Sequence, residues 1–78
     1  MREFTYDARF IEEDDVVVVL FDDLPGCNTQ GKDRAQAKEM AKEALENWLD
    51  TLEHSGIQFP TPSTRNDGNE YVSITAVL

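Results

Sequence analysis

The sequence predicts an α+β domain in which one sheet carries a single helix packed on one face. Apolar and polar residues alternate near both ends of the chain, with the period of two that half-buried strands show. Between these ends, apolar residues recur at steps of three and four, as they do on an amphipathic helix. The expected element order is β-β-β-α-β, and a chain of 78 residues has room for one domain, residues 1–78.

The first two strands are expected over residues 3–12 and 16–21. The first has one apolar face made of alternate residues: Phe4, Tyr6, Ala8 and Phe10. Acidic residues follow and suit a hairpin turn. The second strand is a β-branched run from Val16 to Phe21, which fits a pleated surface. Because both of its faces are apolar, we expect it at the centre of the sheet, with its second face buried or meeting another subunit.

A short third strand and a long helix are expected next. Residues 22–26 form a turn, since Pro25 fixes φ and Gly26 can take a positive φ. Residues 27–31 can then form the third strand. Asp33 is a good N-cap, and Gln36 stands at the capping-box spacing.

The helix is expected to run for about six turns. Its apolar stripe consists of Ala37, Met40, Ala41, Ala44, Leu45, Trp48, Leu49 and Leu52. Its outer face carries Lys38, Glu39, Lys42, Glu43, Glu46 and Asp50. His54 suits the negative end of the helix dipole, and Gly56 is the expected left-handed cap.

An extended connector and a final strand complete the pattern. Residues 57–63 contain two prolines, each of which pushes the preceding residue to an extended conformation. Asp67 and Gly68 indicate a turn. The last strand is expected from Tyr71 to Leu78, with Val72, Ile74, Ala76 and Leu78 on one face.

The formal net charge of −9 limits the classes of partner. Nucleic-acid affinity depends on Lys and Arg, so direct binding of DNA or RNA is not expected. Opposite charge speeds association, which favours a basic protein partner, although the acidic residues could also serve only to keep the chain in solution. The single cysteine, Cys27, excludes an internal disulfide, and no signal-like or membrane-spanning run is present, so a cytoplasmic location is expected.

Two acidic turns are the candidate partner-binding residues: Glu12, Glu13, Asp14, Asp15, Asp22 and Asp23. They could instead be solvated turns, and Asp22 and Asp23 could bond turn amides. A third interpretation is a two-metal nuclease, but such a site needs carboxylates that converge from different strands. No cofactor or metal site is expected.

Other reactive residues have structural interpretations. Cys27 would need a base beside it to act as a nucleophile, and the only histidine, His54, lies at the far end of the helix. Trp48 is expected to pack in the core. One local basic cluster is interleaved with acids and is interpreted as helix surface: Lys32, Arg34, Lys38 and Lys42.

The stretch from Phe21 to Gly31 reads FDDLPGCNTQG and resembles the HicB antitoxin signature F-P-D-L-P-G-C-x-T-x-G. The helix segment AKEALENWL and the connector GIQFPTPS are also similar to that family. One departure is Asp22, where a proline is usual. The motif residues with a structural role are then Phe21, Leu24, Pro25, Gly26, Cys27, Thr29, Gly31 and Trp48.

The resemblance implies a partial ribonuclease H-like sheet with one helix, and a non-catalytic antitoxin that covers a HicA-type toxin, a small basic ribonuclease that cleaves messenger RNA. Many family members add a DNA-binding module after the connector. None is expected here, because no basic recognition helix follows Ser63. Unpaired sheet edges suggest self-association to a dimer or tetramer. The alternatives are an orphan oligomeric domain, and a metal-dependent nuclease of ribonuclease H type.

Overall fold

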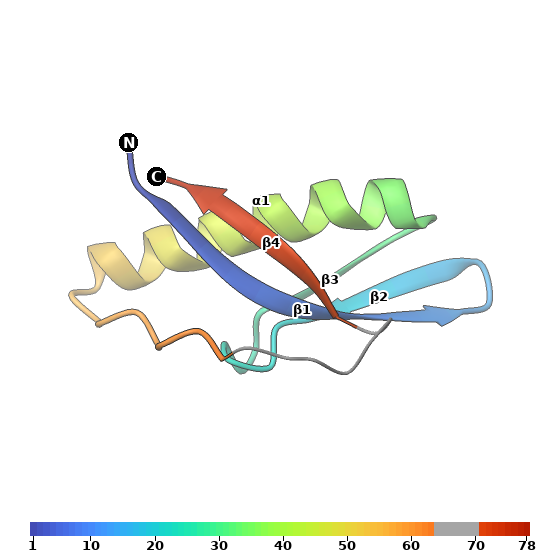
Figure 1. The fold of residues 1–78 in the computed structure, drawn as a ribbon, viewed down its shortest axis with the longest axis horizontal. Helices are drawn as coiled ribbons and strands as arrows, with labels where there is room; N and C mark the ends of the chain where they lie inside the picture. Colours follow the sequence, from blue (N-terminus) through green and yellow to red (C-terminus); the bar gives the residue numbers. More distant parts are fainter. Residues whose placement is uncertain (64–70) are drawn as a thin grey trace.

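The computed structural model of the chain describes residues 1–63 and 71–78. The predicted β-β-β-α-β order is confirmed, and the elements are β1 (Glu3–Glu13), β2 (Val16–Leu20), β3 (Asn28–Gly31), α1 (Arg34–His54) and β4 (Tyr71–Val77). The strands form one antiparallel sheet in the order β3-β2-β1-β4. Figure 1 shows α1 lying across one face of this sheet.

The sheet brings the two ends of the chain together. Strands β1 and β4 pair over seven register positions, from Glu3 opposite Val77 to Arg9 opposite Tyr71. Beyond β4, Arg2 and Leu78 exchange both backbone hydrogen bonds, at 2.9 and 2.8 Å. Strand β2 lies between β3 and β1, so its predicted central position is confirmed. The turn predicted at Asp67 and Gly68 lies outside the described residues.

Both ends of α1 are capped by the residues that the sequence predicts. The Asp33 carboxylate accepts the Gln36 backbone N–H at 2.8 Å. The Gln36 side chain reaches back to the N–H of Lys32, one residue before the cap, also at 2.8 Å. At the other end Gly56 has a φ of 71°, and its N–H donates to the Glu53 carbonyl at 3.1 Å. These contacts satisfy backbone groups that a helix end leaves unpaired.

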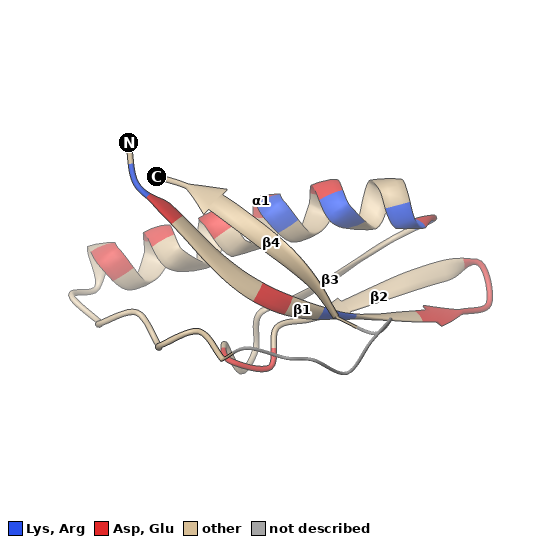
Figure 2. Cartoon of the chain, in the orientation of Figure 1, with Lys and Arg blue, Asp and Glu red and all other residues tan. Residues whose placement is uncertain are grey.

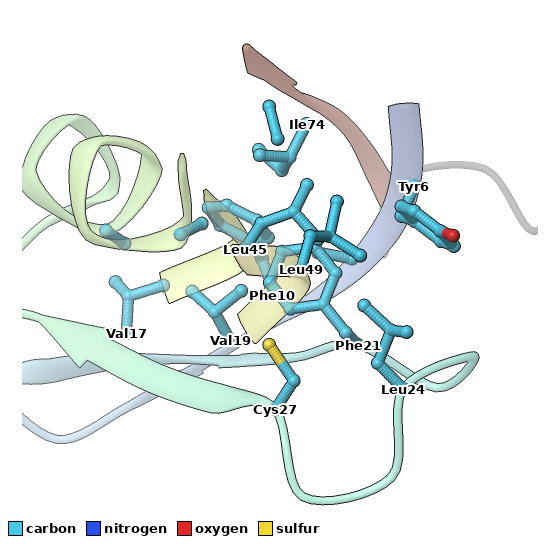
Figure 3. Close-up of a cluster of buried hydrophobic side chains, with 14 residues drawn as sticks. Tyr6, Phe10, Val17, Val19, Phe21, Leu24, Cys27, Leu45, Leu49 and Ile74 are labelled. Atoms are coloured by element: carbon cyan, nitrogen blue, oxygen red, sulfur yellow. The ribbon is translucent and has the colours of Figure 1, made fainter. Parts of the chain in front are cut away.

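The core fills the space between α1 and the sheet (Figure 3). Alternate β1 residues face it, and α1 contributes a narrow line at four-residue steps: Ala37, Ala41, Leu45 and Leu49. The predicted burial of Met40 is wrong, because Met40 lies beside this line and is 36% exposed. No helix in the described part of the chain is both long and apolar enough to cross a membrane.

The connector after α1 folds back along β1. The ring of Phe59 meets Phe4 edge-on, with centroids 4.9 Å apart. The Tyr6 hydroxyl donates to the Pro60 carbonyl at 2.5 Å. Burial raises the pKa of Tyr6, and the nearby Asp23 carboxylate adds to the shift. The connector is therefore held against the strand by both apolar and polar contacts.

Candidate partner-binding surface

The first acidic turn covers the last two residues of β1 and the two residues that join it to β2, and all four are exposed. It consists of Glu12, Glu13, Asp14 and Asp15. Asp15 has a φ of 22°, and the Val16 N–H donates to the Asp14 carbonyl across the turn. Short polar residues such as Asp tolerate positive φ better than most others. Among the described residues, no cation forms an ion pair with these four carboxylates.

The second acidic turn is built on a buried loop. Phe21, Leu24 and Cys27 are each at most 4% exposed and anchor the loop in the core. Their backbones bond to one another: Leu24 N–H to Phe21, Cys27 N–H to Leu24 and Phe21 N–H to Cys27, at 2.8 to 3.1 Å. These bonds close a compact loop and leave its acidic residues half-buried at the surface.

Gly26 lies in the same loop, directly against Trp48. Its φ of 99° is a conformation that side chains rarely adopt, and a Cβ there would meet the Trp48 ring at 3.1 Å. Trp48 is half-buried and packs against the core. Of the other motif residues, Gly31 is buried, Thr29 is half-buried and Pro25 is exposed.

Asp22 and Asp23 are both engaged within the chain. The Asp22 carboxylate accepts the Tyr71 hydroxyl at 2.7 Å and lies 3.5 Å from the Arg9 guanidinium. The Asp23 carboxylate accepts the backbone N–H of Ser63 at 2.8 Å. Asp22 therefore links residues of β1 and β4 across the end of the loop. Asp23 holds the end of the connector against the loop through Ser63.

The structure does not bring the two acidic turns together. They flank β2, whose five residues (Val16–Leu20) separate them by about 17 Å at the usual rise per residue. Figure 2 shows one at the tip of the β1–β2 hairpin and the other at the bend after β2. Two-metal sites hold their ions about 4 Å apart, which this separation does not allow. Within residues 1–63 and 71–78, no group of three His, Cys, Asp or Glu residues is placed to hold a metal.

An apolar patch covers the outer face of the hairpin, opposite α1. This outer-face patch consists of Ile11, Val16, Val18 and Leu20, all half-buried. Ile11 lies directly opposite Val18 in the register. The unbroken apolar run of β2 indicated that its second face would be buried or would meet another subunit. Only the pairing of the strands shows that Ile11 belongs to the same patch.

Arg9 borders the outer-face patch. It stands opposite Leu20 on one side and Tyr71 on the other. Its guanidinium faces Asp22, and its Nε atom is buried without a hydrogen-bond partner among the described residues. The positive charge of Arg9 is thus held beside Asp22, and the residues around the hairpin tip are acidic.

Cys27 and His54 are far apart. The Cys27 thiol points into the core beside the Ala44 carbonyl, at 3.9 Å, and burial raises its pKa to about 11. Ala44 precedes His54 by about three turns of α1, roughly 15 Å along the axis. His54 is exposed at the helix end. The two residues therefore do not form a nucleophile and base pair.

The lysines and arginines of α1 lie in its N-terminal half, with acidic residues among them (Figure 2). Arg34 is the only one of the cluster that reaches the core, where its guanidinium stacks over the Phe10 ring at 5.3 Å. Lys42 is 3.8 Å from Glu46, on the same helix. Glu39 and Glu43 lie on α1 among these cations, so the surface carries charges of both signs.

Comparison with known proteins identifies relatives along nearly the whole chain. Residues 3–78 match the family model described as "HicB_like antitoxin of bacterial toxin-antitoxin system". The chain is 31% identical over 77 residues to Antitoxin HicB 2 of Photorhabdus laumondii subsp. laumondii, covering 99% of this chain and 54% of that protein. The chain thus spans about half the length of this curated relative.

Two solved structures share the fold. A chain from the HicA3 and HicB3 toxin-antitoxin complex superposes with a TM-score of 0.69 at 19% identity, covering 95% of this chain and 96% of that one. The N-terminal domain of Burkholderia pseudomallei antitoxin HicB gives a TM-score of 0.70 at 18% identity, covering 96% and 98%. The four-stranded sheet with one helix is therefore an established architecture.

Proposed function

The chain belongs to the HicB-like antitoxin family of bacterial toxin-antitoxin systems, and we propose that it binds and masks a HicA-type toxin. The observation that carries this proposal is the family match over residues 3–78. The family is one of non-catalytic binding proteins. Inhibition then requires only that the chain occupy the surface on which the toxin binds RNA, so that the substrate is excluded.

The charge of the chain supports this mechanism. A protein that binds RNA carries Lys and Arg at its binding surface, and a net charge of −9 attracts such a surface. The exposed carboxylates of the β1–β2 hairpin are available to it, since none forms an ion pair within the described residues. We expect their contribution to weaken as salt rises.

We also infer that the chain self-associates through a sheet edge. Strand β4 is the longer edge strand, with seven residues against four in β3. Because Arg2 and Leu78 exchange both hydrogen bonds, the Val77 N–H points to the open edge, where it donates to the Glu46 carboxylate at 3.0 Å. A second copy that pairs at this position must displace Glu46. Light scattering of Glu46→Ala and wild type measures this effect, and we expect the variant to associate more readily.

A stoichiometric inhibition assay tests the toxin-masking function. The purified HicA-type protein of the same gene pair is incubated with a labelled messenger RNA, and this chain is added in increasing amounts. We expect cleavage to stop near one equivalent of the chain and to return when excess salt separates the two proteins. Undiminished cleavage at a large excess of folded chain would rule out the proposed function.

A further inference from the structure

We propose that the toxin docks on the outer face of the β1–β2 hairpin, with the outer-face patch at the centre of the contact and the hairpin carboxylates at its rim. The inference rests on the proposed function and assigns toxin binding to one surface of the chain. The partner that fits this surface is a protein with an apolar centre surrounded by Lys and Arg.

The apolar part of the surface is continuous. Val16, Val18 and Leu20 occupy alternate positions of β2, and Ile11 stands beside Val18 on β1. Facing side chains on neighbouring antiparallel strands are about 5 Å apart, so these four form one cluster. Helix α1 packs on the opposite face of the sheet, where Val17 and Val19 are at most 5% exposed.

The hairpin also projects beyond its neighbour strand. Strand β4 begins with Tyr71 opposite Arg9, whereas β1 continues to Glu13. Figure 1 shows the β1–β2 hairpin extending past the beginning of β4. Among the described residues, β4 therefore leaves the last residues of β1 unpaired on the side away from β2.

The charges around the patch select the partner. Glu13 lies opposite Val16 on the outer face, and the turn adds Asp14 and Asp15. The nearest cation on this face, Arg9, is already beside Asp22. An apolar centre with a polar rim is the usual anatomy of a specific interface, and this rim is acidic at the tip of the hairpin.

A second copy of the chain is disfavoured on the same surface. A two-fold contact buries the same residues of both copies, so each hairpin would meet the other. The carboxylates of both turns would then lie at the rim of one interface whose described residues carry no unpaired cation to balance them, and this like charge opposes binding. Self-association through the edge of β4 leaves the outer face of the hairpin accessible.

The test measures binding between the purified HicA-type toxin of the same gene pair and matched variants of this chain. Ile11→Thr with Val18→Thr removes apolar contact while keeping β-branched residues suited to strands. Ile57→Thr is the control, since Ile57 is an exposed apolar residue that lies in the connector, outside the hairpin and the β4 edge. We expect the double variant to lose about tenfold or more in affinity and the control to bind like wild type.

A second set of variants tests the acidic rim. Glu13→Gln with Asp14→Asn removes two charges from the hairpin, and Glu39→Gln with Glu43→Gln removes two charges from α1. We expect the hairpin variant alone to associate about tenfold more slowly at low salt. Thermal unfolding followed by circular dichroism verifies that each variant is folded at the temperature of the assay.

The outcomes separate the two proposals. If wild type binds the toxin and the hairpin variants bind it with the same affinity, this docking surface is overturned and the proposed function stands. Binding lost equally in the hairpin and control variants would also overturn it. No binding by wild type would overturn the proposed function, and the docking surface with it.

Discussion

Gly31, the last residue of β3, lies directly beneath Ala37 in the first turn of α1. A Cβ on Gly31 would come within 2.5 Å of the Ala37 backbone nitrogen, a distance that real Cβ atoms do not show. That nitrogen also donates to the Asp33 carbonyl at 2.8 Å and so closes the first turn of the helix. The third strand and the helix can approach this closely only because position 31 lacks a side chain.

We predict that Gly31→Ala destabilises the protein by about 2 kcal/mol, because the added methyl forces β3 and α1 apart. Urea unfolding followed by Trp48 fluorescence measures the change. Gln30→Ala is the matched control, since Gln30 is the exposed neighbour on β3, and its effect should stay within about 0.5 kcal/mol. Equal stabilities of the two variants would contradict the close approach.

Asp22 is predicted to stabilise the fold. Asp22→Ala removes the carboxylate that accepts the Tyr71 hydroxyl and lies beside the Arg9 guanidinium. We expect a loss of about 1–3 kcal/mol in the free energy of unfolding, against about 1 kcal/mol for Tyr71→Phe. Asp14→Ala, in the exposed turn, should change stability by less than about 0.5 kcal/mol. An Asp22 variant as stable as the Asp14 variant would mean that the carboxylate has no structural role.

Cys27 is predicted to resist alkylation in the folded protein. Its pKa of about 11 leaves about one thiol in a thousand ionised at pH 8, and only the thiolate reacts. Mass spectrometry after iodoacetamide treatment should show little modification of the native chain and complete modification in urea. Rapid labelling without denaturant would indicate that the loop from Phe21 to Cys27 opens readily.

His54 is predicted to titrate above its usual pKa of 6.5. The Asp50 backbone carbonyl, 2.8 Å from Nδ1, raises the pKa most, and the Asp50 carboxylate adds to the shift. Because folding raises the pKa of His54, protonated His54 stabilises the folded chain. This contribution is fully present below about pH 6.5 and is lost as the pH rises through the folded pKa. Nuclear magnetic resonance titration of wild type and Asp50→Asn measures the shift, which should be smaller in the variant. Identical midpoints would exclude the carboxylate contribution.

Local patterns were sufficient to predict most of the fold. The alternation in β1 and the capping residues of α1 act over a few positions, so the sequence specifies them directly. The exposure of Met40 was not foreseen, because helical spacing alone does not reveal how narrow a stripe the sheet covers. The role of Glu46 was also not foreseen, since Glu46 accepts a hydrogen bond from Val77, which is far away in the sequence.

The candidate site was predictable only in part. The composition indicated an acidic surface, and the exposed turn of residues 12–15 is where the sequence placed it. The internal bonds of Asp22 depend on Arg9 and Tyr71, which strand pairing brings from distant parts of the chain. The outer-face patch likewise needs the register that sets Ile11 beside Val18. Long-range pairing of this kind leaves no mark in local residue spacing.

Titration calorimetry of this chain with the purified HicA-type toxin, at low and at high salt, tests the central claim most directly. We predict a saturable complex near equal stoichiometry whose affinity falls as salt rises, because charge attraction contributes to it. An affinity that does not depend on salt would contradict the electrostatic part of the mechanism. No binding at either salt concentration, with both proteins folded, would contradict the antitoxin function.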